Sequence, residues 1–269
     1  MKVADIFVYP IKSLRGTAVE EALVCGYGLE HDRRWILVDA DSKMITQREC
    51  PRLATWHPHV ENGRLRLWLT RGEVIVPFSG DYWTEQQVTL DVWGHGYIGV
   101  LASEAINAAL SQAIGAACRL ASIRSDIFRI KHDVAFHDDS PVLIISQASL
   151  DELNRRSPAP IPMNRFRPNL VISDASPFEE DFWQRITIGD TVLRAVKACE
   201  RCVITTVDQA EGVLKGPEPL KTLATFRRKG DSVAFGQYFR PETKGMRFRR
   251  GEDVRVLELK AEAAAHLPS

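Results

Sequence analysis

Short segments rich in β-branched and aromatic residues recur along the first part of the chain, and clusters of polar residues separate them. Asn62-Gly63 is one such separator, a dipeptide typical of a tight hairpin turn. Regularly spaced short strands of this kind favour a small sheet or a barrel. We expect strands in this part of the chain at residues 6–13, 33–41, 64–70, 73–78 and 87–94.

The pattern changes at Ser103, where alanine, isoleucine and leucine recur at helical spacing behind a serine that can cap a helix. We expect this helix, over residues 103–118, to close a first domain. A second helix is expected over 148–156 behind Ser146, and a third over 219–228. The fold is thus predicted to be mainly β with a few helices (α+β), in two closely packed parts. Further strands are expected at 140–146, 169–174, 185–198, 202–208, 233–239 and 252–259.

Composition and charge exclude several classes of protein. The chain has 269 residues, of which 45% are hydrophobic, so it can bury a core and is not disordered. Its 35 Lys and Arg residues balance 35 Asp and Glu residues, whereas a general nucleic-acid binder carries a basic surplus. No apolar run reaches the roughly 18 residues of a membrane span, and the N-terminus lacks a signal-peptide pattern. We therefore expect a cytoplasmic protein with no nucleic-acid partner and no membrane association.

Five cysteines are an odd number for a chain without an export signal, so a disulfide framework is not expected. Cys199 and Cys202 form a CxxC motif that allows four interpretations. A thioredoxin-type pair would start a helix, but the residues after Cys202 are β-branched. A structural zinc site would need a second pair of ligands. The motif could instead supply one thiolate to a soft transition metal whose other sulfur ligands belong to a cofactor, or hold two inert, partly buried thiols.

Cationic and polar residues gather at the ends of the expected strands. Arginine forks suit phosphate and carboxylate oxygens, and a Lys-Ser pair adds a point charge and a hydroxyl. Taken singly, each is by default a solvated charge or a surface ion pair, but together they suggest a local anion site. The loop of Asp138, Asp139 and Ser140 is either an acid/base pair or a capped turn. The cationic and polar candidates are Lys12, Ser13, Arg33, Arg34, Thr46, Arg48, Arg165, Arg167 and Asn169.

Eight motifs follow one another along nearly the whole chain. They are YPIKS, DRRW, ITQRECPRL, SPVLIISQASLDELN, NRFRPNLVIS, CERCVITTVD, PLKTL and FGQYF. In this combination the chain resembles the MOSC-domain proteins with an N-terminal MOSC β-barrel, a family that includes the bacterial YcbX-type proteins and the mitochondrial amidoxime reducing component. The resemblance implies an N-terminal MOSC β-barrel-like domain over residues 1–120, packed on a MOSC β-barrel domain over residues 121–262.

The resemblance also implies a molybdenum cofactor, a pyranopterin whose dithiolene sulfurs hold the metal. Cys202 matches the family cysteine that completes the protein ligation, and Cys199 matches an accompanying cysteine that does not bind the metal. Asp138 matches a family aspartate near the metal, so a proton donor or a substrate-orienting group is expected there, against the alternative of a turn-capping residue. The positions that match cofactor contacts are Lys12, Ser13, Arg33, Arg48, Ser140, Arg167 and Asn169.

The activity that the resemblance implies is the two-electron reduction of N-hydroxylated compounds such as hydroxylamines, amidoximes and N-hydroxylated bases. The CxxxxCxxC spacing of a ferredoxin domain does not occur, so no iron–sulfur cluster is expected in this chain. Electrons would then come from a separate ferredoxin, flavoprotein or cytochrome, for which the basic run 227–250 is a candidate docking face. The alternative is a MOSC-type molybdenum cofactor or sulfur carrier that uses a persulfide on Cys202.

Overall fold

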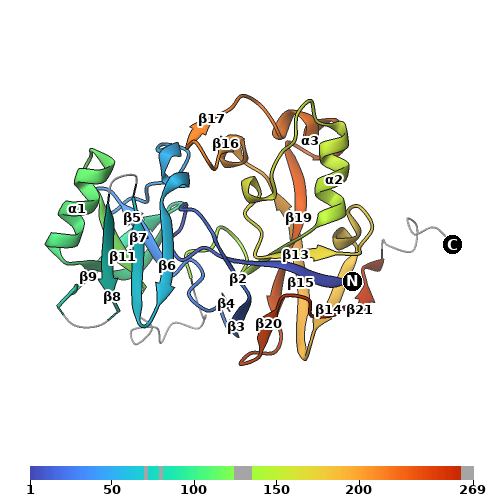
Figure 1. Cartoon of the computed structure of the whole chain (residues 1–269), viewed down its shortest axis with the longest axis horizontal. Helices are drawn as coiled ribbons and strands as arrows, with labels where there is room; N and C mark the ends of the chain where they lie inside the picture. Colours follow the sequence, from blue (N-terminus) through green and yellow to red (C-terminus); the bar gives the residue numbers. More distant parts are fainter. Residues whose placement is uncertain (70–71, 79–80, 124–134, 262–269) are drawn as a thin grey trace.

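Strands from both ends of the chain share the largest sheet (Figure 1). Strand β1 (Lys2–Val8) runs antiparallel to β13 (Leu170–Ser173), which in turn runs parallel to β12 (Val142–Ser146). We describe the protein from a computed structural model, which covers residues 1–69, 72–78, 81–123 and 135–261. The other strands of this nine-stranded sheet are β2 (Thr17–Val19) beyond β1, then β19 (Ser232–Pro241), β15 (Thr191–Glu200), β14 (Trp183–Ile188) and β21 (Val254–Leu259) beyond β12, with β18 (Arg228–Lys229) paired to β19.

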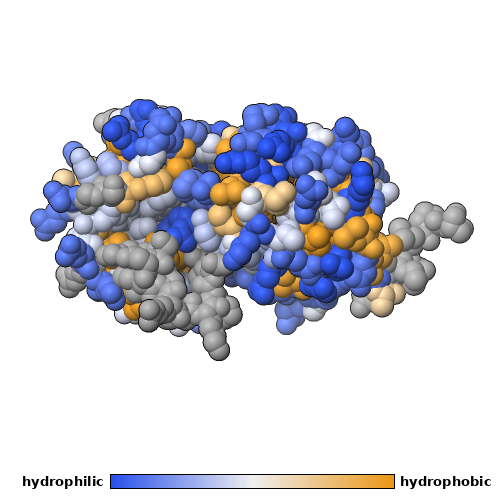
Figure 2. Space-filling model, turned by 90° about the horizontal axis from the view of Figure 1, so that it is seen from below, coloured by the Kyte–Doolittle hydropathy of each residue, from blue (hydrophilic) through white to orange (hydrophobic). Residues whose placement is uncertain are grey.

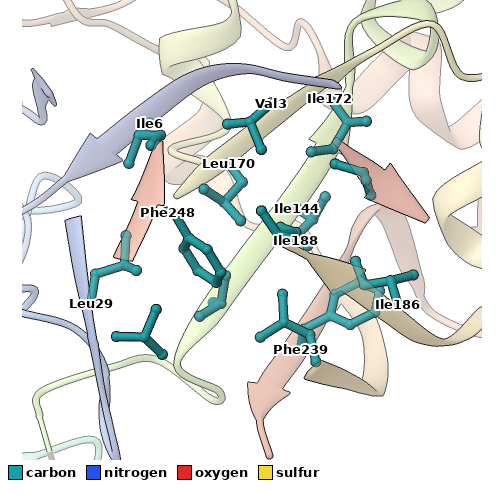
Figure 3. Close-up of a cluster of buried hydrophobic side chains, with 14 of the residues drawn as sticks. Val3, Ile6, Leu29, Ile144, Leu170, Ile172, Ile186, Ile188, Phe239 and Phe248 are labelled. Carbon is teal, nitrogen blue, oxygen red and sulfur yellow. The ribbon is translucent and has the colours of Figure 1, made fainter. Parts of the chain in front are cut away.

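The central strands of this sheet are buried on both faces. Every residue of β12 is buried, with Ile144 in one apolar cluster and Ile145 in another. This alternation follows from the pleat of a strand, which points successive side chains to opposite faces. Figure 3 shows the first cluster, in which Ile144 lies with Leu170, Phe239 and Phe248. A strand buried on both sides needs a continuous apolar sequence, which is what this segment has.

Different elements cover the two faces of the large sheet. A short three-stranded sheet covers the first cluster and contributes Leu29 and Phe248 to it. Two helices cover the second cluster, to which they contribute Leu153 and Leu223. The short sheet consists of β20 (Arg247–Arg249), β3 (Glu21–Cys25) and β4 (Gly28–Leu29), and the helices are α2 (Gln147–Arg156), behind its predicted cap Ser146, and α3 (Leu220–Phe226).

The chain between β4 and Ile123 forms the other half of the molecule, at the left of Figure 1. Two small sheets contribute to one apolar cluster there, and α1 (Glu104–Ile114) packs on it through Leu110. The helix starts behind Ser103, as predicted, but ends before residue 118 because Gly115 takes a left-handed φ of 74°. The sheets consist of β5 (Trp35–Val38), β11 (Arg119–Ser122), β10 (His95–Ala102) and β9 (Trp83–Val92), and of β6 (His57–Glu61), β7 (Arg64–Trp68) and β8 (Glu73–Pro77).

The two predicted domains share sheets. Strands β1 and β2 join the large sheet through β13, and β3 pairs with β20, where Leu23 lies opposite Arg247. Residues 1–120 and 121–262, expected as two domains, are therefore linked by strand pairing as well as by packing. The loop that follows β1 is in this way held against the large sheet while it belongs to the first half of the chain.

The predicted fold class, mainly β with a few helices, is confirmed, with three α-helices in the described residues. Two predicted strands are wrong in part. The strand predicted over 6–13 ends at Val8 and is followed by a turn, and residues 202–208 begin with the 3-10 turn η4 (Val203–Thr206). The amide and the hydroxyl of Thr205 both donate to the Cys202 carbonyl, at 3.1 and 2.9 Å, so a β-branched residue completes a turn here. The remaining short elements are β16 (Val207–Asp208), β17 (Val213–Leu214) and the 3-10 helices η1 (Pro51–Thr55), η2 (Met163–Arg165) and η3 (Glu179–Asp181).

The surface carries apolar residues in separate patches among hydrophilic ones, as the face in Figure 2 shows. Among the described residues, no helix is both long enough and apolar enough to cross a membrane. The large apolar side chains that are exposed include Trp68, Trp93 and Leu257. Of these three, Trp93 also lines the pocket described in the next section.

Gly236 lies in the middle of β19 with a φ of 83°, and a Cβ there would lie 2.6 Å from Ile145 Cγ1 and 3.0 Å from the Ile144 carbonyl oxygen. We expect Gly236→Ala to lower the free energy of unfolding by about 1–3 kcal/mol more than Gly245→Ala does. Gly245 has a similar φ of 86° but open space around it, so it controls for backbone strain. Denaturant unfolding of both variants measures the difference, and equal losses would contradict the close contact.

Candidate active site

One pocket of about 310 Å³ lies between loops from the two halves of the molecule. On one side, the turn after β1, the turn before β5 and the β9–β10 hairpin line it. On the other side, the loops before β12 and β13 and the segment from β15 to η4 line it. The pocket brings together every predicted site residue, namely Lys12, Ser13, Arg33, Arg48, Asp138, Ser140, Arg167, Asn169 and Cys202.

Four pocket residues have left-handed backbone conformations. The φ angles are 65° at Ser13, 49° at Arg33, 58° at Trp93 and 56° at Arg167. A non-glycine residue in this region costs on the order of 1–3 kcal/mol, and it persists only where the surrounding structure holds it in place. Pro10 ends the strand before Ser13, since its ring fixes φ and it has no amide to donate. The pocket is therefore formed by strained turns that strands anchor on both sides.

Tyr9 holds two of the pocket's guanidinium groups side by side. Arg33 and Arg167 each lie over the Tyr9 ring, with 4.3 Å from the guanidinium carbon to the ring centroid. The Tyr9 hydroxyl donates to the Pro168 carbonyl at 3.0 Å. Burial raises the pKa of Tyr9 to about 12 although both arginines oppose the shift, so the ring stays neutral and stacks on two cations. Two positive charges are thus concentrated at one wall of the pocket.

Asp32 is a buried carboxylate that contacts both Arg33 and Tyr9. It is fully buried and accepts hydrogen bonds from Arg33 Nη1 at 2.5 Å and from the Tyr9 amide at 2.8 Å. His137 Nε2 lies 3.3 Å from the same carboxylate. Burial disfavours the charged form of Asp32, but Arg33 and His137 outweigh it and lower the pKa of the carboxyl. Asp32 therefore stays ionised and orients both groups.

Lys12 and Asp138 form an ion pair in the pocket, with 2.5 Å between Lys12 Nζ and Asp138 Oδ1. Lys12 also donates to the Phe136 carbonyl at 2.9 Å. Burial lowers the pKa of Lys12 although Asp138 opposes this, and Arg33 and Arg167 lower it further. Desolvation opposes ionisation of Asp138, but Lys12 and the arginines together lower its pKa well below the usual range. An ionised carboxylate can accept hydrogen bonds but carries no proton to donate.

The two thiols of the CxxC motif have different surroundings. Cys202 is exposed at the start of η4, and Arg48 Nη2 donates to its sulfur at 3.1 Å. Cys199 is buried at the end of β15, and Arg201 Nη1 lies 2.6 Å from its sulfur. The motif therefore does not start an α-helix as a thioredoxin-type pair would. The described residues contain no group of three or more Cys, His, Asp or Glu side chains that could hold a metal, so a zinc site made of protein ligands alone has no support there.

The side-chain amide of Asn169 forms hydrogen bonds to other protein groups and so links neighbouring strands. Its oxygen accepts from the Leu143 amide and from Arg33 Nη1, each at 3.2 Å, and its nitrogen donates to the Phe7 carbonyl at 3.1 Å. Every one of these partners is a protein group. Asn169 therefore positions Arg33 relative to β1 and β12.

Comparison with known proteins decides the family. A model of the MOSC N-terminal beta barrel domain matches residues 1–117, and a model of the MOSC domain matches residues 131–256. Mitochondrial amidoxime-reducing component 1 from Mus musculus is 33% identical to this chain, over 95% of the chain and 82% of the relative. The chain belongs to the MOSC family. The human protein of that name is 34% identical with the same coverage, and a molybdenum cofactor sulfurase from Oryza sativa subsp. japonica is 30% identical over 86% of the chain but only 31% of its own length.

Sequence patterns missed several residues of this MOSC pocket. Trp93, His137, Arg201 and Tyr238 all line it. Trp93 follows a strand pattern and reads as a strand end, and His137 precedes the Asp138 candidate without any metal-ligand spacing. Only the meeting of β9–β10 with the loop before β12 brings these two side chains to the same pocket. Arg34 and Thr46, also considered as candidates, are not among the pocket residues, and Asp139 instead pairs with Lys197.

Proposed function

We propose that this MOSC protein is an oxidoreductase that binds a molybdenum cofactor and reduces N-hydroxylated compounds. The observation that supports it most is the donor set of the pocket, which combines one exposed thiol with a surplus of cationic donors. The amidoxime-reducing relatives make this reaction class the first choice. The proposal names the substrate class as hydroxylamines, amidoximes and N-hydroxylated bases.

The unpaired donors of the pocket fit an anionic cofactor. Arg48 Nη1, Arg165 Nε and Arg201 Nε are buried nitrogens without a hydrogen-bond partner, and all three residues line the pocket. A buried donor left unpaired costs on the order of 1–3 kcal/mol, which an oxygen-rich ligand would recover. Lys12 and Arg167 both have lowered pKa values, through burial first and then through neighbouring cations. A phosphate group of the cofactor would relieve both effects.

Cys202 is the residue that would ligate the metal. Its sulfur is exposed to the pocket, and thiolate is a soft ligand that suits such a metal. When bound, the cofactor supplies the two electrons and the position at which the N–O oxygen is removed. Arg48 Nη2 donates to the Cys202 sulfur at 3.1 Å and so orients it in the pocket. Lys12, Ser13, Arg33 and Arg167 would hold the pterin and its phosphate, with Ser140 beside them.

Asp138 would orient the substrate. Its side chain is 60% exposed in spite of the Lys12 ion pair, so oxygen lone pairs remain available to the pocket. An N-hydroxyl group that donates to this carboxylate would be held with its N–O bond in a defined direction. The protons for the reaction then come from solvent or from groups other than Asp138, because its lowered pKa keeps it ionised.

A separate protein would supply the electrons, of ferredoxin, flavoprotein or cytochrome type. The basic run expected to dock it is partly paired within the chain: Arg227 Nη2 lies 2.5 Å from Asp181, and Arg247 lies 3.0 Å from Glu21. Arg228 and Lys229, on β18, are exposed and are the better candidates for a docking contact. We retain the cytoplasm as the proposed location, although the mouse and human relatives carry a mitochondrial name.

Protein made in a host that produces molybdenum cofactor is expected to convert benzamidoxime to benzamidine and water. Two electrons from a reduced viologen dye and two protons balance the reaction, and mass spectrometry of the amidine measures it. We expect Cys202→Ser to lower the rate by roughly 100-fold or more, since the ligand is lost. A wild-type protein that contains stoichiometric molybdenum and forms no amidine would refute the proposed reaction.

A sulfur-carrier role for Cys202 is the second candidate. The exposed thiol beside Arg48 and the sulfurase relative from rice favour it. A carrier would show a peptide containing Cys202 that is heavier by one sulfur atom, together with no amidine formation. The same preparation therefore separates the two functions by peptide mass spectrometry.

A further inference from the structure

Trp93 is an unusual residue for the place that it occupies. It lies at the tip of the β9–β10 hairpin, in a two-residue turn with Gly94, where Val92 pairs with His95. Both turn residues have positive φ, 58° at Trp93 and 78° at Gly94. Such turns favour asparagine, aspartate or glycine at the first position, and a bulky side chain rarely adopts this conformation. Local turn chemistry therefore does not explain the tryptophan.

The indole of Trp93 contacts both Asp138 and Arg48, the arginine that donates to the Cys202 sulfur. Its Nε1 lies 3.3 Å from Asp138 Oδ1 and donates to it. The guanidinium carbon of Arg48 lies 4.1 Å from the ring centroid, and the same arginine donates to the Cys202 sulfur. Lys12 Nζ lies 5.8 Å from the centroid. The ring is thus held in place between the carboxylate and the thiol.

Part of the Trp93 side chain is not covered by other protein groups. Trp93 is 42% exposed and lines the pocket, so part of the ring is open to a ligand. A substrate whose N-hydroxyl group meets Asp138 would have the rest of its body beside this indole. Planar groups stack on an indole face, whereas a small aliphatic group covers little of it.

We propose that Trp93 is a specificity-determining residue that stacks on planar, aromatic N-hydroxylated substrates and so favours them over small aliphatic ones. The inference rests on the proposed function, since it deepens the substrate class of the same pocket. Trp93 contributes its ring face to the substrate, and its hydrogen bond to Asp138 sets the orientation of that face.

Two amidoximes that differ only in the attached group test this. Benzamidoxime carries a phenyl ring and acetamidoxime a methyl group, so the reacting group is the same. We expect Trp93→Leu to lower the ratio of kcat/KM for benzamidoxime to that for acetamidoxime by about 3- to 10-fold, as the loss of one aromatic stack predicts. Trp93→Phe should keep most of this ratio, because it retains a ring but lacks the indole nitrogen.

Trp68→Leu is the matched control. Trp68 is 40% exposed and lies under Arg66, with 5.2 Å to the ring centroid, but it belongs to β7 and is not a pocket residue. Rates are normalised to molybdenum content. An unchanged ratio in Trp93→Leu, or an equal loss with both amidoximes, would overturn the proposal and leave Trp93 as a support for Arg48 and Asp138.

Calorimetric titration with benzamidoxime separates this inference from the proposed function. We expect Trp93→Leu to weaken benzamidoxime binding by the same factor of about 3- to 10-fold, whether or not turnover occurs. A wild type that binds benzamidoxime through Trp93 but forms no amidine refutes the proposed reaction alone. A wild type that reduces both amidoximes, with binding that Trp93→Leu does not change, refutes the stacking role alone.

Discussion

Cys202→Ser is expected to remove molybdenum from the purified protein, whereas Cys199→Ser keeps it. The serine hydroxyl is a harder ligand than a thiolate and stays protonated, so it cannot complete the coordination of a soft metal. Loss of the ligand should lower the molybdenum content by roughly tenfold or more, since even changes around a ligand weaken metal binding by about 10- to 100-fold. Elemental analysis of protein from a cofactor-producing host measures the effect.

The two substitutions are matched in chemistry but not in environment. Cys202 is exposed to the pocket, whereas Cys199 is buried, with Arg201 Nη1 2.6 Å from its sulfur. Serine at position 199 can still accept a hydrogen bond from Arg201, so that variant should fold. Pterin is measured separately from the metal, because the cations of the pocket can hold the phosphate without the thiolate. Equal molybdenum in both variants would exclude Cys202 as the ligand.

Asp32→Asn is expected to lower the free energy of unfolding by about 3–5 kcal/mol, because it leaves the Arg33 guanidinium without its buried counter-charge. The carboxylate is fully buried and also orients His137 and the Tyr9 amide. An exposed ion pair gives the comparison: Glu61→Gln, which removes the 2.8 Å pair with Arg66, should cost less than about 1 kcal/mol. Denaturant unfolding at neutral pH measures both, and equal effects would contradict the buried pair.

The pH dependence of this difference has a definite sign. Arg33 and His137 lower the pKa of Asp32 in the folded state against the effect of burial. The stabilisation is therefore fully present above the ordinary carboxyl pKa of about 4, and it is lost as the pH falls through the lower folded-state pKa. We expect the gap between wild type and Asp32→Asn to shrink in that acidic window. A gap that grew on acidification would show that Asp32 is protonated in the folded protein.

Local sequence was sufficient for many elements. The serine before each of the first two helices predicted where they start. The Ser146 hydroxyl accepts from the Ser149 amide and caps α2, a contact between near neighbours in sequence, whereas Ser103 makes no side-chain cap bond. The apolar run of β12 predicted a buried strand. Local patterns failed at residues 203–206, where β-branched side chains form a turn through hydrogen bonds to Cys202 and Val203. Strand propensity describes the fit to a pleated surface, and in the described part of the chain no strand pairs with residues 203–206.

The site residues were predicted from ordered motifs and not from periodicity. All nine line one pocket, but the hydrogen bonds and ion pairs that each one makes there did not follow from the motifs. The pairing of Lys12 with Asp138 joins residues far apart in the chain, and it decides that the carboxyl is ionised. Trp93 reaches the pocket because a hairpin tip of one half meets a loop of the other. Such contacts depend on which residues lie close together in the folded chain, and patterns in the local sequence do not predict this.

The sequence by itself determined that this protein is mainly β, where its main helices begin, and which family its motifs match. Tertiary structure alone decided that β1, from the N-terminal domain, pairs with β13 of the MOSC domain. It also decided that Arg33 and Arg167 stack on the same tyrosine, Tyr9. It decided, too, that Cys202 is exposed and Cys199 buried. The physical reason is that secondary structure and capping depend on neighbours along the chain, whereas burial, charge pairing and pKa depend on groups that only the folded chain brings together.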